Sequence, residues 1–191
     1  MNSSFYQLNP ESVMNAAEKA GFQVTGEFTQ LNSYENRVFD IRLETMGTNE
    51  ADRIIAKFYR PGRWSLATIQ DEHDFLFDLA KEGIKAVPPL HIKNAINQQS
   101  SIIEFAGLYV SFFPKIKARM PEEILIKDFP SIGRLMARIH NIGSHKNASH
   151  RIDIGNDAWD NLDLLQKWVA PEVIHRYNQA AECILEFLFS R

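Results

Sequence analysis

One short stretch decides the fold of this chain: Arg53-Ile54-Ile55-Ala56-Lys57-Phe58-Tyr59-Arg60-Pro61. Residues 54, 56 and 58 alternate with residues 55, 57 and 59, which predicts a β-strand with two different faces. Both faces are largely apolar, so a single lysine at the centre of the strand is unusual. Burying an ammonium group costs free energy unless an anion compensates it. The stretch therefore predicts a strand within a sheet and an acidic partner for Lys57.

A candidate partner lies fifteen residues further on, in a predicted helix that begins after Ser65 and ends near Gly83. Glu72 falls on the apolar stripe of this helix, which predicts a carboxylate that points inward. A glutamate at the edge of the stripe that reaches solvent is the alternative, and the spacing alone does not choose between the two. Lys57 favours the ion pair. A strand lysine followed by a helix glutamate is the arrangement that kinases use to hold the phosphates of ATP.

The segments around this pair predict a mixed α and β structure. A helix is expected from the start signal at residues 9–12 to about Ala20, followed by a strand over residues 38–44 in which apolar and polar residues alternate. A turn is expected at residues 46–50. Residues 101–105 and 108–113 flank Ala106-Gly107 and predict a β-hairpin, which Pro114 ends.

The character of the chain changes to helical after Pro114. Apolar residues recur at helical spacing over residues 129–139 and again over residues 173–188. The prediction is an α+β unit at residues 1–113 and a helical unit at residues 114–191, with the junction near residues 113–117. The order of the elements is that of a protein-kinase small lobe, an antiparallel sheet with one main helix, followed by the first helices of an incomplete large lobe.

Composition excludes several classes of protein. The chain has 191 residues, of which 45% are hydrophobic and 24% charged, as in ordinary globular proteins. Its net charge of −3 gives no reason to expect a nucleic-acid partner. Cys183 is the single cysteine, so no internal disulfide framework is expected. The first residues do not resemble a signal peptide, and no apolar run approaches the roughly 18–20 residues of a membrane span. A cytoplasmic protein without a membrane partner is expected.

Several motifs resemble one known family. They are LNSYENRV (31–38), KFYRP (57–61) with Trp64 close behind, EH (72–73), FFP (112–114) and GRLMARIH (133–140). Together they are similar to the bacterial stress response kinase A family. The members are cytoplasmic serine/threonine protein kinases with a fold like that of aminoglycoside phosphotransferases. The similarity extends from about residue 5 to residue 191.

This resemblance implies a nucleotide site. Residues 32–37 would take the place of the loop that covers the nucleotide, with a serine hydroxyl toward ATP, although a polar β-turn is the simpler reading of these residues. The strand lysine would contact the α- and β-phosphates and the helix glutamate would orient it, whereas a purely structural ion pair is the alternative. Residues 111–115 would form the hinge beside the adenine, with one of the two phenylalanines in the core. The candidate nucleotide-binding residues are Ser33, Lys57, Glu72, Phe112 and Phe113.

The chemical half of a kinase site is not found in the sequence. The family uses a loop of the form H-G-D-x-H-x-x-N, which supplies the catalytic aspartate and a Mg²⁺ ligand, and a later aspartate. Residues 150–156 and Asp128-Phe129-Pro130 resemble these motifs, but their spacing or order is wrong. His145 and His150 have no clear third ligand, so no metal site is expected from them. We therefore expect no catalytic residue within residues 1–191. The chain is expected to be an N-terminal portion of a longer kinase.

The sequence thus predicts the ATP-binding portion of a serine/threonine protein kinase involved in stress response, with ATP and Mg²⁺ as cofactors of the whole protein. The chain alone is expected to be inactive. Two alternatives stay open: a small-molecule kinase of the aminoglycoside, choline or homoserine type, and a non-catalytic adaptor that binds nucleotide. A protein substrate with serine or threonine is the expected partner, and a homodimer through the helices at residues 122–143 and 171–190 is a further prediction.

Overall fold

The computed structural model describes residues 3–6, 8–44, 52–93, 100–118, 123–152 and 167–189. The chain divides into two compact units, Met1–Ser149 and His150–Arg191. The boundary between these units differs from the junction that the sequence predicts near residues 113–117, which lies within the first unit. A boundary between two lobes at residues 113–117 stays a prediction. The turn expected at residues 46–50 lies outside the described residues, and the segment 150–156 is described only to residue 152.

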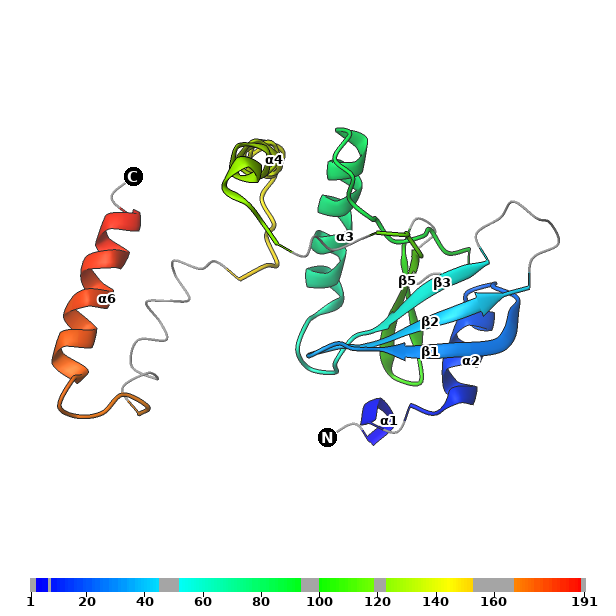
Figure 1. The fold of residues 1–191 in the computed structure, drawn as a ribbon. Coiled ribbons are helices and arrows are strands. Elements are labelled where there is room, and N and C mark those ends of the chain that lie inside the picture. The colour runs from blue at the N-terminus through cyan, green and yellow to red at the C-terminus, as the bar shows by residue number, and fades with distance from the viewer. Residues whose placement is uncertain are drawn as a thin grey trace. The chain divides into compact units, whose positions relative to one another are not determined.

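The first unit holds all the strands of the described residues (Figure 1). Its elements in chain order are α1 (Ser3–Tyr6), α2 (Pro10–Lys19), β1 (Val24–Leu31), β2 (Arg37–Leu43), β3 (Arg53–Phe58), α3 (Leu66–Lys81), β4 (Ile102–Phe105), β5 (Leu108–Pro114), the 3₁₀ helix η1 (Ile126–Asp128) and α4 (Phe129–Gly143). The second unit contains α6 (Ile174–Phe189).

The strands form one antiparallel sheet in the order β1-β2-β3-β5-β4, so β3 is its central strand. Lys57 is in register with Val38 of β2 on one side and with Ser111 of β5 on the other. Ile55 is likewise in register with both neighbouring strands, at the next position on the same face. The predicted α+β class with an antiparallel sheet and one main helix is confirmed, and the strand that carries Lys57 is the centre of it.

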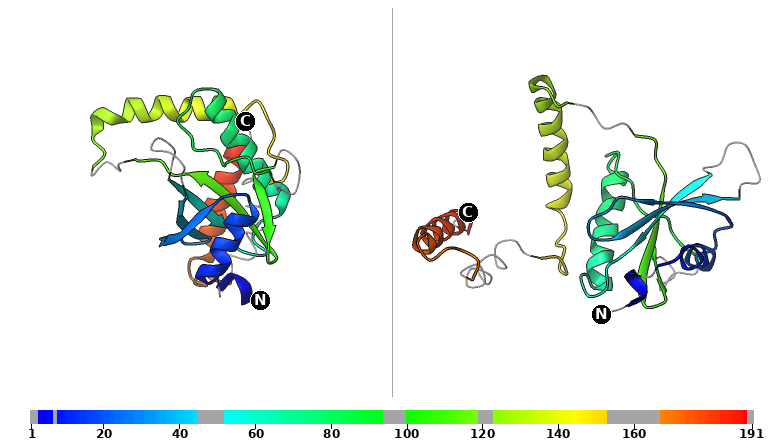
Figure 2. Two further views of the ribbon diagram at one scale, coloured as in Figure 1. Left: turned by 90° about the vertical axis from the view of Figure 1, so that its right-hand side faces the viewer. Right: turned by 60° about the horizontal axis from the view of Figure 1, so that its bottom comes forward.

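The two faces of the sheet differ in chemistry. We call the face that carries Ile54, Ala56 and Phe58 the core face. These residues are buried in one apolar cluster with α2, to which Val13 and Ala17 contribute. We call the opposite face, which carries Lys57, the lysine face. The helix α3 packs on it through Ile69, which is buried against Tyr59 and Ile102. Figures 1 and 2 show α2 and α3 on opposite sides of the sheet.

Helix boundaries follow the predicted capping signals. The side chain of Asn9 accepts a hydrogen bond from the Ser12 amide at 2.8 Å, and α2 begins at Pro10, directly after Asn9. Ser65 caps α3 in the same way through the Thr68 amide at 3.1 Å. Gly83 follows α3 with a φ of +74°, a conformation that glycine adopts without steric cost. The cap that the sequence predicts at Ser65 is confirmed, and this cap fixes where α3 starts relative to β3.

The helix α4 contacts α3 but leaves much of its apolar side exposed. Arg138 donates a hydrogen bond to the Glu82 carbonyl at 3.1 Å, while Leu135 and Met136 are 44% and 46% exposed. No helix among the described residues is long and apolar enough to cross a membrane. The homodimer predicted from the sequence stays a prediction.

Phe112 offers a test of the core face. It is fully buried and its ring lies 5.0 Å from that of Phe22, so Phe112→Ala is expected to lower the free energy of unfolding by about 3–5 kcal/mol. Tyr34→Ala, at a fully exposed aromatic residue, is the matched control and should change it by less than about 0.5 kcal/mol. Urea denaturation measures both. Equal effects of the two substitutions would contradict this account of the core.

Candidate functional site

The ion pair expected between the central strand and the helix is present. Lys57 Nζ donates to Glu72 Oε1 at 2.9 Å, and the two side chains are 22% and 29% exposed. The pair is therefore neither deeply buried nor fully solvated. Because the Lys57 side chain is partly exposed, a second anion could approach it, and the Glu72 carboxylate fixes the position of the ammonium group.

A buried polar chain lies behind this pair. The Lys57 ammonium group is 4.5 Å from the centre of the Tyr59 ring, a cation–π contact. The Tyr59 hydroxyl lies 2.9 Å from His73 Nε2, and His73 Nδ1 lies 2.5 Å from the Ser101 hydroxyl. His73 is fully buried. Because it directly follows Glu72, these contacts fix the part of α3 that carries the glutamate.

Burial lowers the pKa of His73 from 6.5 to about 4. The positive charge of Lys57 acts in the same direction, whereas Glu72 and Asp74 act against it. The imidazole is therefore neutral at neutral pH, with one ring nitrogen that donates and one that accepts. Both hydroxyl neighbours can satisfy either nitrogen, so the buried chain is complete without a charge.

An apolar strip borders the lysine on the same face of the sheet. We define it as Val38, Ile55 and Phe113, one residue from each of three neighbouring strands, all of them half-buried. A flat aromatic base could pack on such a strip while its phosphates reach Lys57. Val38 and Ile55 are candidate site residues that the sequence reasoning missed. The alternation around Lys57 could have identified Ile55, because residues two apart share one face.

The two phenylalanines of the expected hinge lie on opposite faces. Phe113 belongs to the strip, and its ring contacts His73 edge to face with the centres 6.0 Å apart. Phe112 points into the core, and its carbonyl already accepts a hydrogen bond from the Leu90 amide at 2.7 Å. Phe113 is therefore placed with Lys57 and Glu72, and the Phe112 side chain is not.

Ser33 lies in the exposed bend between β1 and β2. This bend is tied to the segment after β3 by the ion pair of Glu35 with Arg63 at 2.6 Å. The side chain of Asn36 also accepts a hydrogen bond from the Arg60 amide at 3.3 Å. Leu31 and Val38 close the bend in register with Lys57. The bend thus lies at the lysine end of the strip, where a loop over phosphates would have to be.

The residues of the strip and the pair suit a nucleotide better than a metal ion. Ser111, opposite Lys57, has a fully buried hydroxyl that makes no hydrogen bond to any described residue. Within the described ranges, no group of three or more histidine, cysteine, aspartate or glutamate side chains could hold a metal ion. The site therefore offers a cation and an apolar surface, and no carboxylate cluster for Mg²⁺.

His73 makes the stability of the chain depend on pH. Its pKa is about 4 in the folded chain and 6.5 without burial, so the unfolded chain takes up a proton first as the pH falls. This contribution is complete above pH 6.5, and roughly 3 kcal/mol of it is lost between pH 6.5 and 4. Chemical denaturation at several pH values in this range measures the free energy of unfolding. This free energy should fall less steeply with falling pH for His73→Gln than for the unsubstituted chain. His145→Gln, at an exposed histidine, should keep the original pH dependence; the same pH dependence in all three proteins would contradict the prediction.

Comparisons with known proteins agree with this geometry. The sequence model described as "Phosphotransferase enzyme family" matches residues 27–191. Stress response kinase A of Salmonella choleraesuis is 35% identical over 152 residues, which are 80% of this chain and 43% of that protein. Stress response kinase A of Escherichia coli K12 is 34% identical over 158 residues, which are 81% of this chain and 45% of that protein. The chain thus spans less than half the length of these relatives.

Two solved structures share the fold. An amicoumacin kinase, solved in complex with AMP-PNP, Ca²⁺ and Ami, matches with a TM-score of 0.55 at 15% identity, over 83% of this chain and 54% of the other. A microcompartment-associated aminopropanol kinase matches with a TM-score of 0.50 at 18% identity, over 74% and 44% of the two chains. The resemblance to stress response kinase A seen in the sequence is confirmed. The chain belongs to the phosphotransferase enzyme family.

Proposed function

We propose that this chain carries the ATP-binding part of a kinase. The observation that supports this proposal most directly is the Lys57–Glu72 pair at 2.9 Å, which is half-buried beside the apolar strip. Lys57 would bind phosphate oxygens, and Glu72 would hold the ammonium group in place when the nucleotide is absent. Val38, Ile55 and Phe113 would carry the base. The bend that contains Ser33 would cover the phosphates, with backbone amides and a hydroxyl as donors.

The chemistry of the bound nucleotide is phosphoryl transfer, which depends mainly on positioning and on compensation of negative charge. Lys57 supplies one of the positive charges that this reaction needs. Its cation–π contact with Tyr59 and its pairing with Glu72 hold the ammonium group before ligand arrives, so little ordering is left for the binding step. Mg²⁺ is expected as a cofactor of the kinase, with ligands other than the described residues.

The proposed substrate is a serine or threonine side chain of a protein, in a response to stress. Support comes from the names of the relatives at 34–35% identity, which include "Stress response kinase A" and "Serine/threonine protein kinase RdoA". The two structural neighbours are named as kinases of small molecules, but at 15–18% identity they carry the fold alone. A small-molecule kinase and a nucleotide-binding adaptor stay as the alternatives. A cytoplasmic location, expected from the sequence, also stays a prediction.

Residues 1–191 alone are expected to transfer no phosphate. The sequence lacks the H-G-D-x-H-x-x-N pattern that supplies the catalytic aspartate in the proposed family. Incubation of the purified chain with radiolabelled ATP, Mg²⁺ and a general protein substrate should give no labelled product above a blank without protein. Labelled protein that disappears in the Lys57→Ala variant would overturn this expectation, because it would place the chemistry within these residues.

Lys57→Ala tests the proposed role of Lys57 in phosphate binding. The substitution removes a charged hydrogen-bond donor, so the affinity for ATP is expected to fall about ten- to a hundredfold. Isothermal titration calorimetry of the chain with ATP measures the change. Lys85→Ala, at an exposed lysine after α3, is the matched control and should bind as the unsubstituted chain does. Unchanged affinity in Lys57→Ala would refute the phosphate role, and absence of binding in every variant would refute the proposed function.

A further inference from the structure

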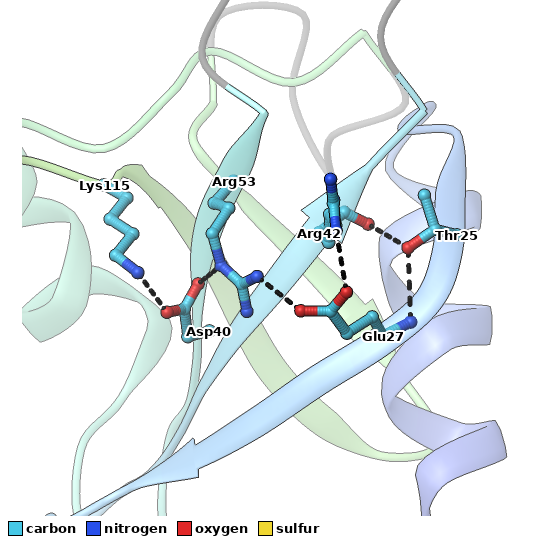
Figure 3. A network of polar contacts seen from close by, with 6 residues as sticks. All are labelled: Thr25, Glu27, Asp40, Arg42, Arg53 and Lys115. Atoms are coloured by element: carbon cyan, nitrogen blue, oxygen red, sulfur yellow. Dashed lines mark hydrogen bonds and ion pairs between the residues drawn. The ribbon is translucent and has the colours of Figure 1, made fainter.

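A second group of charges lies on the lysine face, beside the apolar strip. Figure 3 shows that Asp40 of β2 stands between two cations. Arg53 Nε of β3 donates to Asp40 Oδ1 at 2.7 Å, and Lys115 Nζ donates to Oδ2 at 2.5 Å. Glu27 of β1 completes the group by binding Arg53 at 2.7 Å and Arg42 at 3.0 Å. We call these five residues the charge cluster.

The two carboxylates of the cluster are in different environments. The side chain of Glu27 is 52% exposed, whereas that of Asp40 is 8% exposed. Burial on its own would raise the pKa of Asp40, but the hydrogen bonds from Lys115 and Arg53 outweigh it and hold the pKa below its usual value. Asp40 is therefore ionised at neutral pH. A buried carboxylate that loses one of its cations is costly, so both bonds constrain the structure.

Lys115 differs from the other members because it lies outside the sheet. The last position of β5 in register with β3 is Pro114, opposite Ile54. Among the described residues 115–118, Lys115 is the one for which the structure gives a hydrogen bond to the sheet. Asp40 thus joins β2 to the segment that leaves β5, across 75 residues of sequence.

This bond lies next to the proposed base site. Asp40 is in register with Ile55, and Ile55 is in register with Phe113, so the carboxylate occupies the same row of the sheet as two residues of the strip. Lys57 lies two residues further along β3 than Ile55, in the next row of the same face, opposite Val38. A nucleotide with its phosphates at Lys57 and its base on the strip would point its base toward the segment that Asp40 holds.

We propose that Asp40 is a positioning residue that holds residues 115–118 against the sheet through Lys115 and so preserves the base end of the nucleotide site. The inference rests on the proposed function. It assigns the two ends of the site to different supports: Glu72 for the phosphate end and Asp40 for the base end.

The first test does not need a nucleotide. Asp40→Asn keeps the size of the side chain but removes the charge that binds Lys115. The backbone ¹⁵N order parameters of residues 115–118, measured by NMR relaxation, should fall from about 0.85 toward about 0.6. Glu27→Gln is the matched control, because it breaks the exposed ion pairs of the same cluster and does not touch Lys115. Its order parameters at residues 115–118 should match those of the unsubstituted chain. Unchanged order parameters in Asp40→Asn would overturn the proposal.

A double substitution identifies the route. If Asp40 acts on the segment through Lys115, Lys115→Met should lower the order parameters of residues 115–118 as much as Asp40→Asn, and the two together should add little. Lys115→Arg should retain high order parameters, since a guanidinium group can still pair with the carboxylate. Additive effects of the two substitutions would show that they act separately and would contradict this route.

The second test separates the two ends of the site. Asp40→Asn should lower the affinity for ATP about tenfold and leave the affinity for inorganic tripolyphosphate unchanged, because tripolyphosphate has no base. Lys57→Ala should lower the affinity for both ligands. A general loss of structure would weaken both ligands in Asp40→Asn as well and would refute a role at the base end. If the unsubstituted chain binds neither ligand, the proposed function and the base-end role fail together, and the NMR order parameters still decide whether Asp40 holds the segment.

Discussion

The central position of β3 is the constraint on which the rest of this structure depends. A strand paired on both sides cannot turn a side chain to the edge of the sheet, so each of its residues must lie on one face or the other. The core face takes Ile54, Ala56 and Phe58, which are buried with α2. Lys57 is thereby placed on the opposite face, where a helix must bring an anion or the lysine must remain in water. Glu72 of α3 supplies that anion.

The ion pair is nevertheless a weak source of stability. Exposed ion pairs contribute about 1 kcal/mol or less, and for this half-buried pair the cost of removing both charges from water offsets part of the attraction. The position of α3 is set instead by Ile69, which is buried, and by His73, which bonds Tyr59 and Ser101. The fold thus places the pair, and the pair does not hold the fold together. Such a pair can respond to a ligand without loss of the surrounding structure.

Local patterns in the sequence predicted a large part of this arrangement. The cap at Ser65, the stripe that carries Glu72 and the alternation around Lys57 are each determined by residues close together in the chain, and each is confirmed. The sequence does not delimit the strand β1, because most of its residues are exposed and an edge strand lacks a clear apolar alternation. The opposite faces of Phe112 and Phe113 follow from alternation alone, but which of them faces Lys57 depends on the register of β5.

The charge cluster could not be predicted from the sequence for a different reason. Asp40 of β2 and Arg53 of β3 are ordinary residues of alternating strands. Lys115 comes 75 residues after Asp40, directly behind a proline. Only the strand order, which places β3 between β2 and β5, brings a residue after β5 within reach of β2. Along β3, Ile55 of the apolar strip lies between Lys57 and Arg53 of the cluster. A single sheet face therefore combines an ion-paired lysine, an apolar surface and the bond from Asp40 to Lys115 after β5, and the register of three strands sets the spacing between them.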